Sequence, residues 1–417
     1  MTFIKNLLSY LSLPVQQSIN NKPVYIPRDK HMLSRKNISP EALQVLYKLH
    51  KSGYKALLVG GGVRDSLLKR TPKDFDIVTN AHPEQVTSLF RRCRLIGRRF
   101  VLAHVYISKE IIEVATFRAS HKNNNAGIIQ DGRIIRDNVY GKTVDEDAVR
   151  RDFTINAIYY DISNLSLFDY ANGMEDLNNG VIRLIGDPIQ RYKEDPVRML
   201  RAIRFVAKLD FTMAPETAAP ITDLANLLKN IPAARLFEEV QKLFLSGHAV
   251  KSLQQMREYN LFAQLFPLTE SCLNDPIAAR LIQEVLENTD ARQQNNQTIT
   301  AGFLFAALLW PPLSNLLPKE QAKGVNQQEV LFEAIEYLLK QQQKHVAIPR
   351  RIAILMQEIW LLQLRLTRPR RGKKKNFKLL QHPRFRAGYD FLVLRVKAGE
   401  QEVASEAAWW TKFQQRK

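Results

Sequence analysis

The chain has 417 residues, with 61 Lys and Arg against 41 Asp and Glu, so its formal charge is +20. This length predicts two to four structural units, and the positive surplus favours a polyanionic partner, nucleic acid or an anionic membrane surface, over the alternative of a basic protein without such a partner. Only two cysteines occur, and the longest apolar run is residues 301–310, which argues against a disulfide framework, a structural zinc site and a membrane-spanning helix, and fits a cytoplasmic protein.

The first 38 residues predict a basic lead-in, because they are polar, contain Pro23 and Pro27 and show little periodicity. Apolar positions near the N-terminus are compatible with a weak peripheral membrane contact. A helix is predicted to begin next: Ser39 is a favourable N-cap, Pro40 suits the first helical position, and apolar residues follow at helical spacing.

Residues 54–118 predict alternating strands and helices. The run YKALLV is typical of a buried strand, the glycines after it of a turn, and VRDSLLKR of a helix. DFDIVTN (74–80) predicts a strand, PEQVTSLFRR a helix, and the alternating runs RFVLAHVYI and IIEVATFR two more strands. We therefore expect a mixed α/β unit over residues 39–175.

The pattern changes after this unit's last strand signal. Residues 119–147 are rich in Asn and Gly and predict a surface loop. From about residue 187 onward, apolar residues recur at helical spacing. Residues 365–378 hold eight Lys and Arg and no acid. We expect an all-helical second part with one strongly basic segment, for which a solvated loop is the plain alternative.

Asp74 and Asp76 are two residues apart on the predicted strand, so their side chains point to the same face. Two adjacent carboxylates repel each other and a divalent cation removes that cost, so the pair predicts a magnesium site that also accepts phosphate oxygens. Glu113 stands between apolar residues and is predicted to be buried, which is costly unless the acid is paired or metal-bound. A solvated turn, and a surface acid on an edge strand, are the alternatives.

The glycines Gly60, Gly61 and Gly62 join a predicted strand to a predicted helix. Without Cβ atoms their backbone can approach a triphosphate, and the helix N-terminus offers free N–H groups to it. Arg64 in the first helical turn can fork onto phosphate oxygens. The motif is neither GxGxxG nor a Walker A sequence, which argues against a dinucleotide fold and a P-loop.

Two clusters of arginine and carboxylate follow. RRDFTIN (150–156) places Arg151 and Asp152 before an apolar run that ends at Asn156. EDPVRMLR (194–201) predicts the start of a helix on which Asp195, Arg198 and Arg201 share a face. Taken alone, each cluster is also compatible with ordinary ion pairs on a helix surface.

In this order, GGGVRD, DFD, IIEVATFR, RRDFTIN and EDPVRMLRAIRFVAKL resemble the motifs of the class II nucleotidyltransferases, the family of tRNA CCA-adding enzymes and bacterial poly(A) polymerases. The resemblance covers residues 50–215 densely, and the stretch LFRRCRLIGRRFVLAHV (89–105) resembles the poly(A) polymerase branch. It implies a head related to DNA polymerase beta with a mixed sheet (39–175), followed by an all-helical neck (176–245) and then body and leg segments (246–417).

The resemblance also implies roles for individual residues. Asp74, Asp76 and Glu113 would hold two Mg²⁺ ions, or Mn²⁺ in their place, and Asp152 would be counted with these catalytic acids. Gly60, Gly61 and Arg64 would hold the triphosphate and ribose. Arg151 and Asn156 would shape the nucleotide site, Asp195 and Arg198 would contact the base edge, and Arg201 would lie close to the phosphates.

The implied activity is the addition of AMP from ATP to RNA 3′ ends, with a role in RNA turnover and RNA-decay proteins as partners. The basic segment would bind the RNA backbone without sequence preference. Its predicted RNA-binding residues are Arg368, Arg370, Arg371, Lys373, Lys374 and Lys375. A CCA-adding enzyme is the main alternative, and a catalytically silent RNA-binding protein on the same head is the second.

Overall fold

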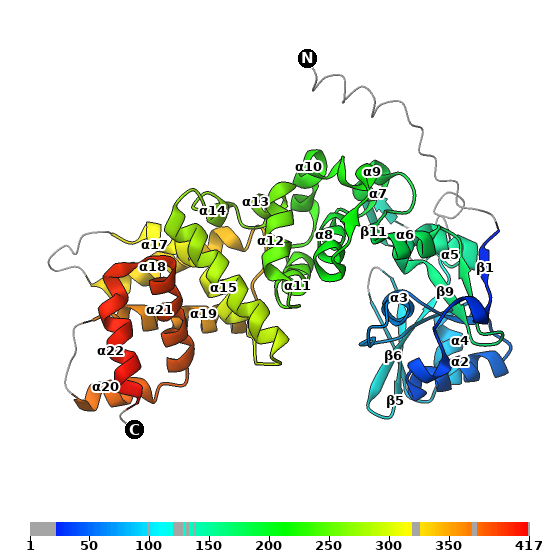
Figure 1. The fold of residues 1–417 in the computed structure, drawn as a ribbon, viewed down its shortest axis with the longest axis horizontal. Coiled ribbons are helices and arrows are strands. Elements are labelled where there is room, and N and C mark those ends of the chain that lie inside the picture. Colours follow the sequence, from blue (N-terminus) through cyan, green and yellow to red (C-terminus); the bar gives the residue numbers. More distant parts are fainter. Residues whose placement is uncertain are drawn as a thin grey trace, which may run out of the picture. The chain divides into compact units, whose positions relative to one another are not determined.

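The computed structural model describes residues 22–97, 100–119, 128–130, 133–136, 139–318, 326–368 and 373–415, with residues 128–130, 133–136 and 373 described by their backbone alone. The chain divides into two compact units, which we call the head unit (residues 1–198 with 211–220) and the helical unit (residues 199–210 with 221–417) (Figure 1). This confirms the predicted fold class, an α/β head followed by helices. The predicted domain boundaries stay predictions.

The head unit contains an eight-stranded mixed sheet in the order β1-β10-β9-β2-β3-β6-β5-β4. Its strands are β1 (Val24–Ile26), β2 (Ala56–Val59), β3 (Asp76–Thr79), β4 (Cys93–Ile96), β5 (Leu102–Ile107), β6 (Glu110–Thr116), β9 (Ile158–Asp161) and β10 (Ser166–Asp169). The β3–β6 pair is parallel, whereas the other strand pairs of this sheet are antiparallel. Two smaller pairs are β7 (Ile128–Gln130) with β8 (Arg133–Arg136) and β11 (Val181–Ile182) with β12 (Thr212–Met213).

The head unit also contains α-helices and 3-10 turns. They are α2 (Pro40–Lys51), α3 (Gly61–Leu67), α4 (Pro83–Leu89), α5 (Val144–Arg150), α6 (Gly173–Asn179), α7 (Pro188–Glu194) and α9 (Pro215–Ala218), with the 3-10 turns Arg28–Lys30, Arg35–Asn37 and Thr154–Asn156. All four residues of β2 are buried, whereas β6 alternates between buried and exposed residues. One face of the sheet is therefore open at β6, and this opening is where acidic side chains can meet solvent.

In the head unit, one local prediction from the sequence is confirmed and others were wrong or missed an element. The helix start at Ser39 is confirmed: its side chain accepts a hydrogen bond from the Ala42 N–H at 3.2 Å. The lead-in prediction was wrong for residues 24–26, which form edge strand β1 by pairing with β10. The loop prediction for 119–147 was wrong in part, because β7, β8 and the start of α5 lie there. Strand β4 was not predicted, since its short run CRLI lacks a clear alternation.

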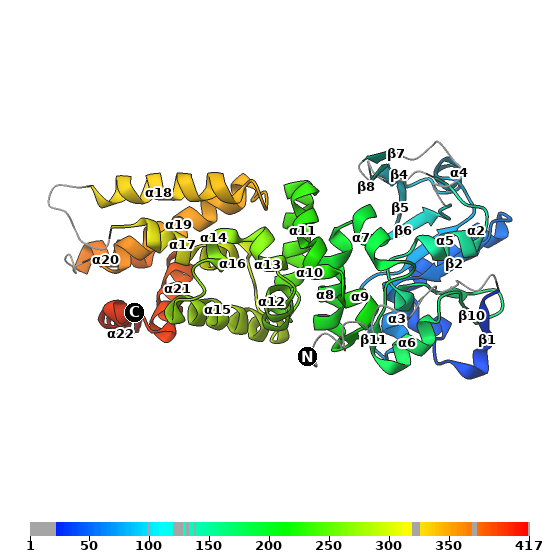
Figure 2. The ribbon, with the colours of Figure 1, turned by 90° about the horizontal axis from the view of Figure 1, so that it is seen from above.

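The helical unit consists of helices and turns in the part that the structure describes (Figure 2). After α8 (Val197–Leu209), in which the boundary between the units lies, its α-helices are α10 (Ile221–Leu224), α11 (Ala233–Phe244), α12 (Ala249–Glu258), α13 (Leu261–Leu265), α14 (Pro267–Glu270), α15 (Pro276–Gln294), α16 (Ala301–Leu308), α17 (Trp310–Leu316), α18 (Gln327–Gln342), α19 (Arg350–Leu366), α20 (Lys373–Leu380), α21 (Phe385–Ala398) and α22 (Ala404–Gln414). Two 3-10 helices, Ala225–Asn230 and Gln401–Val403, complete it.

Candidate active site

Two acids lie side by side on the open face of the head sheet. Asp76 on β3 and Glu113 on β6 are register partners in the parallel pair, so their side chains emerge on the same face. Asp76 is half-buried, and the Glu113 side chain is 47% exposed. The prediction that Glu113 is buried was wrong: alternation buries its neighbours Ile112 and Val114 and turns the acid outward. His104 on β5 approaches it, with Nε2 3.3 Å from Glu113 Oε1.

Asp74 lies just before this pair, on the loop that leads into β3. The predicted strand 74–80 was too long by two residues at its start, since β3 begins at Asp76. The Asp74 side chain is exposed. Its main chain packs closely against α3, because a Cβ on Gly62 would lie 2.9 Å from the Asp74 carbonyl oxygen. Glycine at 62 therefore lets the helix come close to the acidic loop.

Gly60 forms the other wall of this acidic site. It adopts φ +77°, a conformation that favours glycine. A Cβ here would stand 3.2 Å from Asp76 Oδ2 and 3.8 Å from Arg151 Nη1, whereas one on Gly61 would stand 3.6 Å from Arg64 Nη2. The bare backbone thus leaves room beside a carboxylate and two guanidinium groups, which is the space that a bound phosphate needs.

Arg64 is buried within a chain of polar side chains. Its Nε donates to Asp65 Oδ1 at 2.8 Å, and its Nη1 donates to Asn156 Oδ1 at 2.7 Å. Asn156 Nδ2 in turn donates to Asp152 Oδ1 at 3.1 Å. Three of the predicted site residues, from sequence positions 64, 152 and 156, therefore belong to one connected network. Arg64 thus joins Asp65 to Asn156, and its predicted contact with phosphate oxygens stays a prediction.

Arg151 is held by two residues that the sequence did not single out. Its Nε donates to Asp147 Oδ2 at 3.0 Å and to the Tyr159 hydroxyl at 2.9 Å, and that hydroxyl donates to Asp147 Oδ2 at 2.8 Å. Burial lowers the pKa of Arg151, but Tyr159, Asp147 and Asp76 together raise it above its usual range. Burial, and then Asp147, raise the pKa of Tyr159. The guanidinium therefore stays charged and the phenol stays protonated. In the sequence, the i, i+4 spacing of Asp147 and Arg151 was the signal that could have indicated this ion pair.

A second buried cluster lies where α7 ends and α8 begins. Glu194 is the last residue of α7, and Asp195 caps its C-terminus, so one predicted helix start is in fact a junction between two helices. Arg198 Nη1 donates to the Arg191 carbonyl oxygen at 2.6 Å and to Glu194 Oε2 at 3.2 Å. Asp195 and Arg198 are both buried, which a surface ion pair would not be.

Arg191 ties this cluster to the residues around position 151. It donates to Glu194 Oε2 at 2.8 Å and to the Arg150 carbonyl oxygen at 3.0 Å. Burial raises the pKa of Glu194, but Arg191 and Arg198 outweigh it and lower the net pKa. Burial lowers the pKa of Arg198, with Asp195 opposing it. Arg191 was missed, and Glu194 was noted in the cluster 194–201 without a site role, because in sequence neither differs from an ordinary helix-surface charge.

The remaining predicted residues belong to the helical unit. Arg201 lies on α8, where its guanidinium carbon is 5.5 Å from the centre of the Phe205 ring. Of the predicted RNA-binding residues, Arg368 is half-buried after α19, and Lys374 and Lys375 are exposed on α20. Lys373 begins α20, and its side chain lies outside what the structure describes; Arg370 and Arg371 lie wholly outside the described residues.

The acidic face can be tested as a metal site from its donors. Among the described residues, no three His, Cys, Asp or Glu side chains converge closely enough to hold a metal ion. The donor chemistry fits a hard divalent cation, because Asp74, Asp76 and Glu113 offer carboxylate oxygens. Two of these acids, Asp76 and Glu113, are register partners on neighbouring strands. Repulsion between like charges keeps such side chains apart until a cation joins them.

Comparisons with known proteins bear on this arrangement. The family model "Poly A polymerase head domain" matches residues 56–183, "Probable RNA and SrmB- binding site of polymerase A" matches 210–273, and "Polymerase A arginine-rich C-terminus" matches 323–417. Poly(A) polymerase I of Salmonella typhimurium is 48% identical over 99% of this chain and 90% of its own length. The chain belongs to the poly(A) polymerase family. It is a nucleotidyltransferase, as predicted.

The chain is less similar to the CCA-adding enzymes of the wider family than to the poly(A) polymerases. The CCA-adding enzyme of Lactobacillus helveticus is 39% identical over 51% of this chain and 52% of its own length. The crystal structure of the Bacillus stearothermophilus CCA-adding enzyme with CTP is similar with a TM-score of 0.59 and 26% identity, covering 91% of this chain and 82% of that one. The preference for the poly(A) polymerase branch is therefore confirmed. No helix that the structure describes is long and apolar enough to span a membrane.

Proposed function

We propose that this chain extends RNA 3′ ends without a template by transferring AMP from ATP. The RNA 3′ oxygen forms a bond to the α-phosphorus of ATP, the bond to pyrophosphate breaks, and the 3′-OH proton leaves to solvent. The observation that carries the proposal is the register pairing of Asp76 with Glu113 beside Gly60 and Arg151. This arrangement combines carboxylates for a cation, backbone room for phosphates and a fixed positive charge.

Asp74, Asp76 and Glu113 are the residues that we propose hold two Mg²⁺ ions, with Mn²⁺ as an alternative metal. Bound there, the cations would lower the pKa of the RNA 3′ hydroxyl and neutralise the departing pyrophosphate. Arg151 contributes charge next to Asp76, and its position is set by Asp147 and Tyr159 before any substrate binds. Preorganised charge of this kind costs little reorganisation during the reaction.

The nucleotide is proposed to lie between the Gly60 turn and the polar chain through Arg64, Asn156 and Asp152. In this arrangement Gly60, Gly61 and Arg64 contact the triphosphate and ribose, while Arg151 and Asn156 shape the nucleotide site. We propose Asp152 as a catalytic acid together with Asp74, Asp76 and Glu113. Its Oδ1 accepts hydrogen bonds from Asn156 Nδ2 and from the Phe153 N–H. Its hydrogen bonds keep the carboxylate oriented and available to the site.

Asp195 and Arg198 are proposed to read the base edge of ATP, and Arg201 to contact phosphates. Burial supports the first assignment, because a buried hydrogen-bonding group discriminates strongly against a base that leaves it unpaired. Glu194 and the Arg191 carbonyl oxygen engage one end of the Arg198 guanidinium. They thereby limit how that group can turn toward a base.

Binding of the RNA chain itself is proposed to involve Arg368, Arg370, Arg371, Lys373, Lys374 and Lys375. Phosphate contacts by Lys and Arg tolerate any sequence, which suits addition to many different 3′ ends. A role in RNA turnover, RNA-decay proteins as partners and a cytoplasmic location complete the proposal. A weak membrane contact through the N-terminus would fall on residues 1–21, which lie outside the described residues.

Primer extension with each nucleoside triphosphate alone tests the proposed reaction. An oligoadenylate primer should be extended many times with ATP and Mg²⁺, and CTP alone should yield no comparable ladder. Chelation of divalent cations with EDTA should stop extension, and Mg²⁺ should restore it. Incorporation of CTP into a transfer RNA lacking its CCA end, with no ladder on oligoadenylate, would instead establish the CCA-adding reaction.

A further inference from the structure

A pocket in the helical unit lies among helices α19, α20 and α22. Its volume is about 630 Å³, within the range of pockets that hold small ligands. We call it the α19–α22 pocket, and its lining residues are Arg365, Leu366, Thr367, Arg368, Lys375, Asn376, Lys378, Leu379, Glu406, Trp409 and Trp410. Four of these side chains are cationic and one is acidic, so the pocket carries a net positive charge.

The four cations of this pocket differ from neighbouring arginines in their partners. None of Arg365, Arg368, Lys375 and Lys378 makes a side-chain hydrogen bond or ion pair with another residue that the structure describes. In the same unit, Arg384 pairs with Glu358 at 3.0 Å, Arg386 with Asp390 at 2.9 Å and Arg395 with Glu400 at 2.6 Å. Charges gathered in a concave site without carboxylate partners are suited to an anionic ligand.

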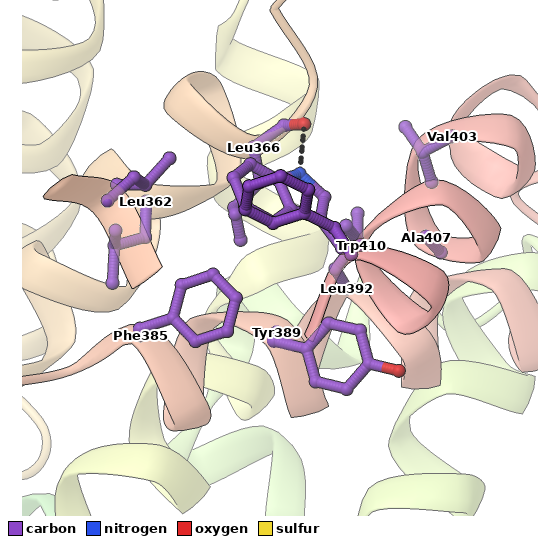
Figure 3. Close-up of a cluster of buried hydrophobic side chains, with 10 residues drawn as sticks. Leu362, Leu366, Phe385, Tyr389, Leu392, Val403, Ala407 and Trp410 are labelled. Atoms are coloured by element: carbon purple, nitrogen blue, oxygen red, sulfur yellow. Dashed lines mark hydrogen bonds between the residues drawn. The ribbon is translucent and has the colours of Figure 1, made fainter. Parts of the chain in front are cut away.

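The floor of the pocket is part of the hydrophobic core of the unit. Leu366, Leu379 and Trp410 line the pocket and also belong to the buried cluster shown in Figure 3. Trp410 Nε1 donates to the Leu366 carbonyl oxygen at 3.0 Å, which joins α22 to α19 (Figure 3). Arg365, Lys375 and Lys378 therefore lie on packed helices, whereas Arg368 follows the end of α19. This argues against the solvated-loop alternative for Lys375 and Lys378.

Tryptophan supplies a second kind of surface to the same pocket. The Trp409 ring stacks on Phe413 with centroids 4.6 Å apart and an interplanar angle of 15°, so its orientation is set by packing. An aromatic wall beside unpaired cations matches the combination that binds single-stranded nucleic acid, in which phosphates meet cations and bases lie on aromatic rings. A simple inorganic anion would make no use of the aromatic wall.

We propose that the α19–α22 pocket binds single-stranded RNA at a nucleotide away from the 3′ end, through its phosphate and base. This inference rests on the proposed function only in naming RNA as the substrate. Arg365 and Lys378 of the basic segment, and Trp409 outside it, become RNA-binding residues in addition to the six that were predicted. They act in a defined pocket, separate from the binding of the reacting 3′ hydroxyl.

Binding of an RNA that cannot be extended tests this site. A fluorescein-labelled oligoadenylate with a 3′-deoxy end is titrated with the full chain in EDTA and without ATP, at several salt concentrations. Because catalysis is absent from this assay, an inactive enzyme that still binds would disprove the proposed reaction without affecting the pocket. The double substitution R365Q and K378Q should weaken binding several-fold and reduce the salt slope by about 0.7 for each phosphate that is no longer neutralised.

A charge-matched control separates the pocket from general electrostatics. The double substitution K344Q and R386Q removes two exposed positive charges elsewhere in the helical unit, so it should leave affinity and slope nearly unchanged. RNA binding that is weakened equally in both double variants, or that is weakened in neither, would overturn the proposal. Free ATP that displaces the RNA at the stoichiometry of one site would also overturn it, in favour of a free-nucleotide site. Thermal unfolding measured by circular dichroism checks that each variant folds.

The base contact has its own measurement. W409L should weaken binding of oligoadenylate more than binding of an abasic phosphodiester of the same length, because only the former can lie on the ring. Trp310 and Trp360 are buried in other parts of the unit, and W409L leaves both in place. Equal weakening of both ligands would show that the pocket recognises phosphate alone and would refute the base contact.

Discussion

The charged residues of the head site and those of the α19–α22 pocket are organised in opposite ways. In the head, Arg64, Arg151 and Arg198 are buried or largely buried, and each makes defined hydrogen bonds to neighbouring oxygens. In the pocket, Arg365 and Lys378 are exposed and make no such bonds to described residues. The same residue types thus serve two purposes within one chain.

The difference fits what we propose that each region recognises. A buried cation is costly unless its donors are satisfied, and the partners that satisfy them fix a geometry that suits one nucleotide in one orientation. An exposed cation keeps its hydration and its side-chain freedom, so it can contact the phosphates of RNA of any sequence. Salt screens this interaction. Under the two proposals, the buried charges of the head would select the substrate and its geometry, and the exposed charges of the pocket would attach RNA of any sequence.

Removal of an acid at the head should have the largest effect. D76A should lower kcat below roughly a tenth of the wild-type value, because the remaining acids cannot hold both cations in line with the attacking oxygen. The fold should persist, since repulsion on the open sheet face is relieved. Single-turnover extension measures this, with the exposed acid at the start of β6, changed as E110A, as the control. D76A with near-normal turnover would mean that the metal-binding acids lie elsewhere.

Removal of the buried arginine at the α7–α8 junction should come next. R198A should weaken use of ATP by roughly tenfold or more, as expected when hydrogen bonds to a charged group are removed, and narrow the preference for ATP over CTP. The ratio of kcat/KM for the two nucleotides is the measurement. R204A, on the same helix six residues later, serves as a control for the removal of charge. An unchanged ratio would place base selection in the shape of the pocket instead.

A smaller effect is expected from the hydroxyl that positions Arg151. Y159F removes one of the bonds to Arg151 and leaves Asp147 in place, so activity should fall by roughly fivefold, equivalent to about 1 kcal/mol. The decrease should appear in kcat more than in the KM for RNA. Y170F removes a hydroxyl from the adjacent ring, which packs edge-on against Tyr159, and should be nearly neutral. Equal decreases in both variants would indicate a packing effect.

The smallest change is expected within the basic segment. Replacing Lys373, Lys374 and Lys375 together with Gln should raise the KM for RNA and flatten its salt slope, by about 0.7 for each phosphate left without its cation. ATP binding should stay unchanged. The single variants sharpen the comparison, because Lys375 lines the pocket and Lys374 does not: K375Q should reduce the slope more than K374Q. Identical slopes would argue for a diffuse charge effect.

Much of the fold could be predicted from local patterns. Ser39 and Pro40 start a helix wherever the chain continues amphipathically, and β-branched alternation marks strands such as β5 and β6 without tertiary information. Edge strand β1 was not recognised, because it depends on β10, a partner strand far along the chain. Edge strand β4 pairs with the next strand, β5, but its short run lacks a clear alternation. The surface-loop prediction for 119–147 was wrong in part for another reason: β7 and β8 are short neighbouring strands in an Asn- and Gly-rich segment, whose composition is typical of a loop.

By itself, the sequence determined the residue types and their order: paired acids after a glycine turn, two arginine-carboxylate clusters, and a basic segment near the end. Only the tertiary structure decided which of these charges are buried and which partners they have. Glu113 is outward because β6 has an open face, Arg151 is held by Asp147 and Tyr159, and Lys378 shares a pocket with Arg365. Burial is decided by the strands and helices that the fold brings together. Even for partners close in sequence, such as Asp147 and Arg151, the local pattern does not show that the pair is buried or that Tyr159 joins it.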